Sequence, residues 1–97
     1  MLADAMEQKD NNLIASTRAN LSVTYEDQGQ YEKAIQECEL GLQLSEVAPR
    51  YKGLLAYSLA GNYMQLKQYY LAKNHHQNAM NLLEPITNKA KEYGLEN

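Results

Sequence analysis

Tryptophan and phenylalanine are absent from the sequence, cysteine occurs once and proline twice. The single cysteine, Cys38, excludes an intrachain disulfide and a zinc site built from several cysteines. No apolar run approaches the ~18 residues of a membrane-spanning helix, and the first residues lack the basic start and apolar core of a signal peptide. Lysine and arginine are scattered and the formal net charge is −3, which argues against a nucleic-acid surface. We therefore expect a cytoplasmic protein that binds neither membrane nor nucleic acid.

Apolar residues recur at three- and four-residue spacing, and no segment alternates as a strand would. This periodicity predicts an all-α fold with helices over about residues 2–9, 12–27, 31–45, 49–66 and 69–83. Pro85 is expected to break or kink the last of these, and a short capping helix is predicted over residues 86–93. Gly29 can end the 12–27 helix in a left-handed conformation, and Pro49 suits a first helical turn.

One face of each helix is expected to be buried. Gly41 lies inside the 31–45 helix at a cost of about 1 kcal/mol relative to alanine. That cost is explained if another helix crosses Gly41 at close range. The residues expected on the buried faces are Ile14, Thr17 or Arg18, Leu21, Ser22, Tyr25, Tyr31, Ala34, Ile35, Cys38, Gly41, Leu42, Leu55, Ala56, Leu59, Ala60, Tyr63, Ala72, His76, Ala79, Met80 and Leu83.

Two stretches of the chain resemble each other at one constant offset. Thirty-eight positions separate Leu21 from Leu59, Tyr25 from Tyr63, Tyr31 from Tyr69 and Ala34 from Ala72. A repeat of this length predicts a helical solenoid, with repeats over about residues 11–46 and 49–84 of a single domain spanning 1–97. The second turn lacks the glycine of the first, so Lys67 or a neighbour is expected to carry backbone strain. The sequence leaves open whether the chain is whole or a piece of a longer array.

The repeated residues resemble the tetratricopeptide repeat, whose pattern of Leu-Gly, Tyr, Ala, a large aromatic residue and Pro extends over about 34 residues. The matching residues are Leu21, Ser22, Tyr25, Gly29, Tyr31, Ala34, Gly41 and Leu42 in the first copy, and Leu59, Ala60, Tyr63, Tyr69, Ala72, Ala79 and Met80 in the second. The tryptophan position of the pattern holds Arg18 and Ala56, and the aromatic position of its second helix holds Cys38 and His76. The resemblance covers roughly residues 13–84 and implies a right-handed superhelix of antiparallel helical hairpins.

No group of residues has the spacing of a catalytic or metal site. His75 and His76 are adjacent and point about 100° apart on a helix, so they cannot share a metal ion as residues four apart can. Cys38 lies on the buried stripe, where an inert packed thiol is expected. The acidic pair Glu26 and Asp27 is expected on a solvated helix face. We therefore expect no enzymatic activity, no metal and no cofactor.

In the repeats that this chain resembles, the first helix of each hairpin lines a concave groove that binds peptides. By position, the resemblance assigns to this groove Asn20, Val23, Asp27, Leu54, Tyr57, Ser58, Gly61 and Gln65. The Asn20 amide has a donor and an acceptor with which it can clamp a peptide backbone. Tyr57 lies off the apolar stripe and is expected to be an exposed contact residue. Leu54 and Ser58 stand where chaperone-binding members need Lys or Arg, so the two-carboxylate clamp of those members is not expected.

The resemblance implies a non-catalytic module that binds a protein or peptide and forms part of a regulatory or scaffolding protein. Two alternatives remain: the peptide-sensing domain of a bacterial transcriptional or signalling regulator, and a self-associating structural module. About three repeats are usually needed for a stable stack, and the predicted helix over residues 2–9 is a short cap. An exposed apolar end is therefore expected, and with it a homodimer.

Overall fold

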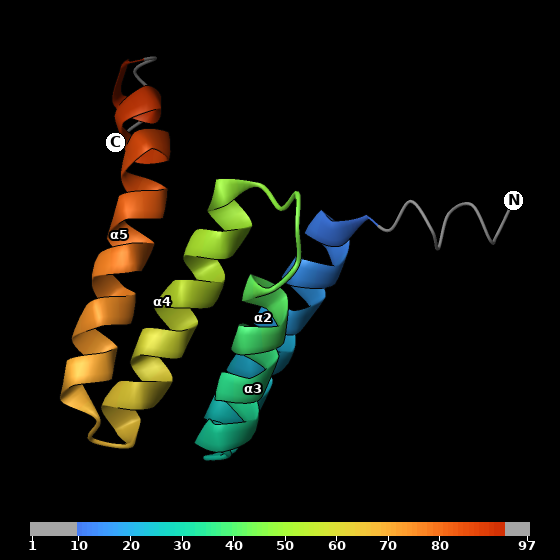
Figure 1. Cartoon of the computed structure of the whole chain (residues 1–97), viewed down its shortest axis with the longest axis vertical. Coiled ribbons are helices and arrows are strands. Elements are labelled where there is room, and N and C mark those ends of the chain that lie inside the picture. The colour runs from blue at the N-terminus through green and yellow to red at the C-terminus, as the bar shows by residue number, and fades with distance from the viewer. Residues whose placement is uncertain (1–9, 93–97) are drawn as a thin grey trace, which may run out of the picture.

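The computed structural model describes residues 10–92, with side chains described through Lys89, and within this range it contains four helices and no strand (Figure 1). The helices are α2 (Asn11–Asp27), α3 (Tyr31–Leu42), α4 (Pro49–Gln65) and α5 (Tyr69–Glu92). The predicted all-α class is thus confirmed for the described residues. The helix predicted over residues 2–9 lies outside this range, as does the end of the helix predicted over 86–93.

Local side-chain chemistry sets where α2 and α4 begin. The Asp10 carboxylate accepts a hydrogen bond from the Leu13 N–H at 3.1 Å, which satisfies a donor that the first turn of α2 leaves free. Pro49 occupies the first turn of α4 as predicted, where its missing N–H removes no helical bond. The Asn12 side-chain oxygen accepts from the Ala48 N–H at 2.8 Å, so the loop before α4 is tied to the start of α2.

The two turns inside the hairpins have the same backbone structure. Gly29 closes α2 at φ 75°, and Lys67 closes α4 at φ 63°. In the first turn the Gln30 N–H donates to the Tyr25 carbonyl at 2.8 Å, and in the second the Gln68 N–H donates to the Tyr63 carbonyl at 2.9 Å. These are the six-to-one bonds of the Schellman motif, which needs a left-handed residue after the helix. The strain predicted at Lys67 is confirmed, because a lysine there adopts the conformation that Gly29 adopts freely.

The structural repeat follows the sequence repeat residue by residue. Both α2 and α4 have 17 residues, and each bound of α4 lies 38 positions after the matching bound of α2. The start of α5 likewise lies 38 positions after the start of α3. The second helices differ in length, with 12 residues in α3 and 24 in α5. Two copies of one helical hairpin therefore follow each other along the chain.

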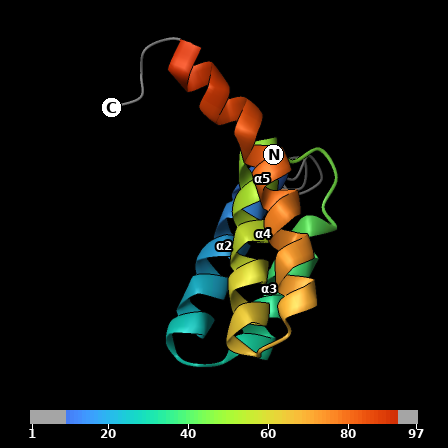
Figure 2. The same cartoon turned by 90° about the vertical axis from the view of Figure 1, so that its left-hand side faces the viewer.

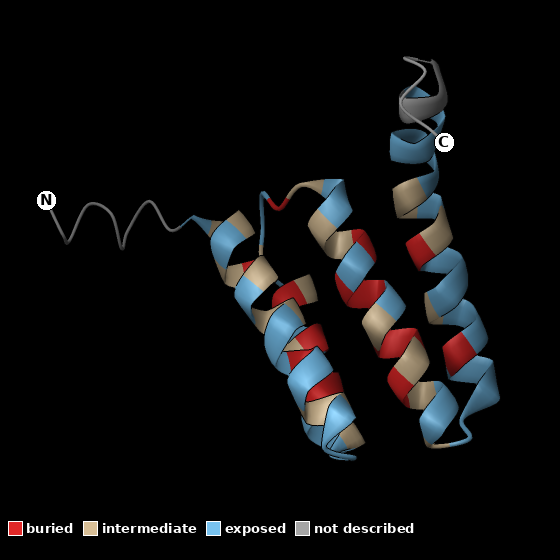
Figure 3. Cartoon of the chain, turned by 180° about the vertical axis from the view of Figure 1, so that it is seen from behind, coloured by how far each residue is buried: buried red, intermediate tan, exposed pale blue. Residues whose placement is uncertain are grey.

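Helix α4 lies at the centre of the packing. It contacts α2, α3 and α5, whereas α5 packs against no other helix of the described region (Figures 1 and 2). Figure 3 shows that buried residues gather along the faces that the helices turn toward one another. A Cβ atom added to Gly41 would lie 2.7 Å from Leu55 Cδ1. The predicted close crossing at Gly41 is thus confirmed, and the helix that crosses it is α4.

Two predicted inward positions, Leu21 and His76, are wrong because both side chains are exposed. Leu21 is 40% exposed, whereas its repeat counterpart Leu59 is 1% exposed because it packs against Ile35 and Cys38 of α3. His76 is exposed, whereas its counterpart Cys38 is fully buried.

The tyrosines of the repeat framework also differ from the prediction. Tyr25 and Tyr63 are only half-buried, and Tyr69, which was also expected to pack between helices, is 59% exposed. Ala15 and Gly53, which the periodicity did not place inside, are buried, as is Asn62. Small residues reach the interior where helices lie close together, and the larger tyrosine rings extend past the contact.

Pro85 does not end α5. The helix continues to Glu92, so a separate helix over residues 86–93 does not form within the described range. Figure 2 shows α5 bending away from the other helices in its C-terminal part. A proline inside a helix removes one backbone hydrogen bond and its ring crowds the preceding turn, which produces a kink. The predicted kink is therefore found, and the predicted break is not.

Candidate functional site

Two adjoining cavities open on one face of the molecule. The α2–α4 cavity, about 300 Å³ in volume, is lined by Ala19, Asn20, Val23, Glu26, Leu54, Tyr57, Ser58 and Gly61. The α4–α5 cavity, about 360 Å³ in volume, is lined by Tyr57, Ala60, Gly61, Met64, Tyr69, Ala72, Lys73 and His76. Because Tyr57 and Gly61 line both, the two cavities adjoin at these residues of α4. We call this surface the α4 groove.

Most of the groove residues predicted from the sequence meet in the α2–α4 cavity. Five of the seven side chains assigned from the sequence line it, namely Asn20, Val23, Leu54, Tyr57 and Ser58. The predicted glycine, Gly61, lines it too. The other two, Asp27 and Gln65, are exposed at the last residues of α2 and α4 and line neither cavity.

The sequence prediction missed four polar or flexible residues of the groove, Glu26, Met64, Lys73 and His76. One signal could have found two of them: Glu26 and Met64 are repeat counterparts at the same offset of 38 positions. Lys73 and His76 lie on α5, a second helix of its hairpin, and the resemblance placed only first helices on the groove. They line the α4–α5 cavity because α5 packs directly against α4.

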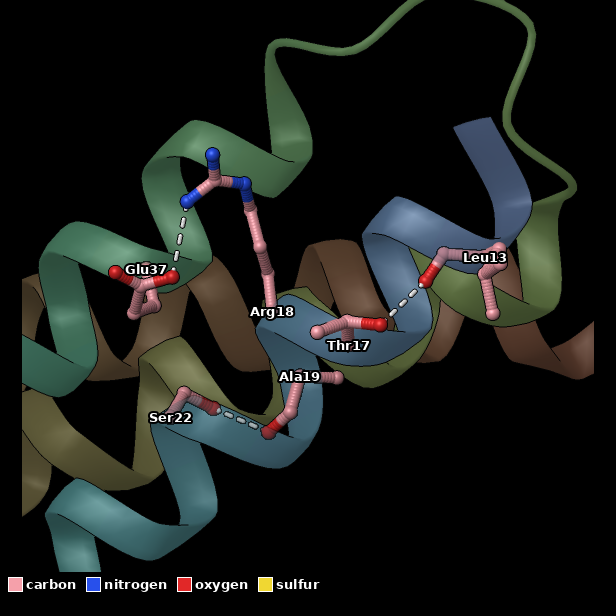
Figure 4. A network of polar contacts seen from close by, with 6 residues as sticks. All are labelled: Leu13, Thr17, Arg18, Ala19, Ser22 and Glu37. Carbon is pink, nitrogen blue, oxygen red and sulfur yellow. Dashed lines mark hydrogen bonds and ion pairs between the residues drawn. The ribbon is translucent and has the colours of Figure 1, made fainter. Parts of the chain in front are cut away.

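Ser58, which lines the α2–α4 cavity, belongs to a hydrogen-bond network with the buried residues Ser22 and Asn62. The Ser22 hydroxyl donates to the Ala19 carbonyl at 2.8 Å (Figure 4) and lies 2.8 Å from the Ser58 hydroxyl. A serine has one hydroxyl proton, so the Ser58 hydroxyl is the donor in that second bond. The Asn62 amide donates to the Ser58 carbonyl at 2.7 Å. Ser58 therefore joins α2 to α4, and its hydroxyl proton is not free to bind a ligand.

Tyr57 stands between the two cavities. It is 55% exposed, and its ring centroid lies 6.0 Å from that of His76 on α5. A half-exposed tyrosine offers a rigid apolar surface with a polar end, which suits a contact residue. The sequence prediction that Tyr57 is exposed on the groove side of its helix agrees with this position.

Glu26 is the charged side chain of the α2–α4 cavity. Burial, and then the neighbouring carboxylate of Asp27, raise the pKa of Glu26 above its usual range. Arg18, the nearest basic residue on α2, binds Glu37 of α3 at 2.9 Å instead (Figure 4). The Glu26 carboxylate forms neither a hydrogen bond nor an ion pair with any residue of the described region, although the Glu26 backbone carbonyl accepts from the Gly29 N–H at 2.9 Å.

Cys38 and His75, the other side chains that could take part in chemistry, are packed against neighbouring residues. Cys38 is fully buried, and its burial raises the pKa of its thiol although Ser22 and Ser58 act in the opposite direction. His75 stacks on Tyr63 with ring centroids 5.4 Å apart. Within residues 10–92, no three His, Cys, Asp or Glu side chains gather as metal ligands. None of the helices in the described region is both long and apolar enough to cross a bilayer.

Comparison of the chain with family models, curated proteins and solved structures finds no match. The support for the repeat and for the groove therefore comes from the sequence and structure of this chain alone.

Proposed function

We propose that the chain is a non-catalytic interaction module, similar to a tetratricopeptide repeat, that binds an extended peptide or protein segment in the α4 groove. The observation that carries this proposal is that two cavities adjoin at Tyr57 and Gly61, one on each side of α4. Together the two cavities form a surface that extends over α2, α4 and α5, and an extended segment could lie across these three helices.

The repeated hairpin supports the family resemblance. The helices of the two hairpins begin at matching positions, and both turns have a left-handed residue followed by the same six-to-one hydrogen bond. Hairpins that repeat in this way stack their neighbours into a superhelix, because each unit buries its apolar face against the next. The right-handed solenoid implied by the resemblance is therefore part of the proposal.

The size and chemistry of the groove favour a peptide. Ligand pockets are typically about 300–1,000 Å³, and both cavities lie at the lower end of that range, suited to one side chain each. Val23, Leu54 and Met64 provide apolar walls, and each is about half exposed. The exposed Asn20 amide adds a donor and an acceptor that match a peptide bond. Such a module serves as part of a regulatory or scaffolding protein.

The test is a double substitution at the two exposed polar positions of the groove. Asn20→Ala with Tyr57→Ala is expected to weaken a peptide selected on the wild-type chain by about 1–3 kcal/mol, while helicity and melting change little. Asn74→Ala with Tyr70→Ala is the matched control, because both residues are exposed on α5 and line neither cavity. Equal binding by the two double variants would contradict the assignment of the groove.

A second candidate function, self-association, is favoured by the outer face of α2. Leu13 is 63% and Leu21 40% exposed there, beside Ile14 and Thr17 in a further shallow cavity. The repeat counterpart of Leu21 is buried between helices, so this face has the composition of one that another helix covers.

Light scattering during size-exclusion chromatography tests self-association. A homodimer is expected to give twice the monomer mass at high concentration, and Leu21→Glu is expected to return the mass to that of a monomer. Because Leu21 is partly exposed, the variant is expected to keep its fold. A monomer mass for the wild-type chain at every concentration would refute the homodimer.

A further inference from the structure

The Glu26 carboxylate lies in the α2–α4 cavity, next to Gly61 of α4. Its Oε2 atom lies 3.5 Å from the point where a Cβ atom would stand on Gly61. The side chain therefore extends from α2 across to α4, where the bare backbone at Gly61 leaves room for it. Glu26 is half-buried, in contrast to Asp27, which is exposed.

No cation of the described region neutralises this carboxylate. The residues that line the α2–α4 cavity include one acid and neither lysine nor arginine. Arg18 is held by Glu37, and Lys33 lies over the Tyr25 ring at 5.9 Å from its centroid. A partly buried carboxylate without a partner is a costly arrangement, and a cation supplied by a ligand would remove that cost.

The rest of the cavity suits the side chain that would carry such a cation. Lysine and arginine have long apolar stems and a charged end. Val23 and Leu54 provide an apolar wall for the stem, and Tyr57 provides an aromatic ring beside the charged end. The Asn20 side chain lines the same cavity, so it would lie near a backbone amide of the peptide beside that residue.

The α4–α5 cavity has an apolar side chain at the position where the α2–α4 cavity has the carboxylate of Glu26. Met64, the repeat counterpart of Glu26, lines the α4–α5 cavity and is 51% exposed. Methionine favours apolar ligands and adapts to their shape. Helices that pack side by side lie about 8–10 Å apart. A peptide in the extended polyproline II conformation rises about 3.1 Å per residue and has three residues per turn, so side chains three residues apart point to the same side. Two side chains about three residues apart would therefore reach the two cavities.

We propose that Glu26, with Tyr57 and Asn20, forms a subsite for a lysine or arginine side chain of an extended peptide, and that an apolar residue about three positions away enters the cavity beside Met64. This inference rests on the proposed function of the α4 groove and names the class of its ligand. The ligand is a basic–apolar segment, which is opposite in charge to the acidic ligands of a carboxylate clamp.

A library of random dodecapeptides displayed on phage tests the proposal. The library is selected in parallel on the wild-type chain, on Glu26→Gln and on Glu84→Gln. Glu84 is exposed on α5 and lines neither cavity, so its substitution removes the same charge away from the groove. The wild-type chain and Glu84→Gln are expected to enrich peptides with Lys or Arg near an apolar residue. Glu26→Gln is expected to keep the apolar preference and to lose the basic one.

A synthetic peptide from the wild-type selection then measures the coupling between Glu26 and the basic residue of the peptide. Replacing its basic residue by glutamine is expected to raise Kd about tenfold or more on the wild-type chain. The same replacement is expected to change Kd less than twofold on Glu26→Gln. Circular dichroism of each variant verifies that the helices are retained.

The outcomes separate this inference from the proposed function. Enrichment of peptides without a basic preference, or of acidic peptides, would overturn the Glu26 subsite and leave the groove as a peptide site. A basic preference that survives in Glu26→Gln would also overturn it. If the wild-type chain enriches no peptide at all, the proposed function fails and the subsite fails with it.

Discussion

Alanine substitution of two helical glycines is expected to have different effects on stability, with a gain at Gly61 and no gain or a loss at Gly41. Gly41 lies in α3 and Gly61 in α4. Glycine inside a helix is less favourable than alanine by about 0.8–1.0 kcal/mol, so propensity alone favours both substitutions. The difference between the two positions comes from what the new methyl group would meet.

At Gly41 the new methyl group would meet a side chain that cannot move away. Its Cβ would lie 2.7 Å from Cδ1 and 2.9 Å from Cδ2 of Leu55. Leu55 is fully buried in a core cluster with Ala15 and Val47. At Gly61 the nearest atom is Glu26 Oε2 at 3.5 Å, which is an ordinary contact.

The balance of the two effects gives the expected magnitudes. Overpacking a filled core costs about 1–3 kcal/mol, which exceeds or cancels the gain in propensity at Gly41. Gly41→Ala is therefore expected to lose about 0–2 kcal/mol of stability, and Gly61→Ala to gain about 0.5–1 kcal/mol. In a domain of this size 1 kcal/mol corresponds to about 4–8 °C in Tm.

Urea and thermal unfolding followed by circular dichroism measure both variants under the same conditions. Gly41→Ala is expected to melt below the wild-type chain and Gly61→Ala above it. If both variants gain the same stability, α4 does not cross α3 closely at Gly41. That result would refute close helix crossing as the reason for a glycine inside α3.

Four further substitutions test the turns, the hairpin contacts and the groove. Lys67→Gly is expected to stabilise the chain by about 1 kcal/mol, because glycine adopts a positive φ without strain, and its urea midpoint should rise. Ala34→Leu and Ala72→Leu are each expected to cost about 1–3 kcal/mol in urea unfolding, since both alanines are buried between helices, and an unchanged midpoint would reject that packing. Burial and Asp27 raise the pKa of Glu26, so its protonated form is favoured by folding, and the stability that this preference contributes is lost as pH rises through the folded-state pKa. Glu26→Gln is therefore expected to be more stable than wild type at pH 7, and to lose this advantage as the pH falls to the ordinary glutamate pKa of about 4.3 and below. A gain that persists at acid pH would show that charge is not its cause.

Features that depend on a few neighbouring residues could be predicted from the sequence. The offset of 38 positions located both hairpins, and the small residues Ala34 and Ala72 were identified as buried from that offset alone. The backbone strain at Lys67 followed from the missing glycine in the second turn. Turn chemistry and helical periodicity act over one or two turns of chain, so they can be read without knowing the fold.

In the groove, position along the repeat identified several lining residues of the first helices, but it missed Glu26 and Met64 and included Asp27 and Gln65, which line neither cavity. Asn20, Val23, Leu54, Tyr57 and Ser58 were predicted, and the structure brings them together. Their common location follows because α2 and α4 are copies of one helix that lie side by side.

Which helix faces are covered depends on the tertiary structure and could not be predicted from the sequence. Leu21 and Leu59 occupy the same position in the repeat, yet α3 covers Leu59 and no described helix covers Leu21. The same difference leaves His76 exposed beside the groove while Cys38 is buried. Glu26 gained its place in a cavity because α4 presents Gly61 opposite it. Burial depends on what packs against a residue from elsewhere in the chain, and neither periodicity nor repeat position contains that information.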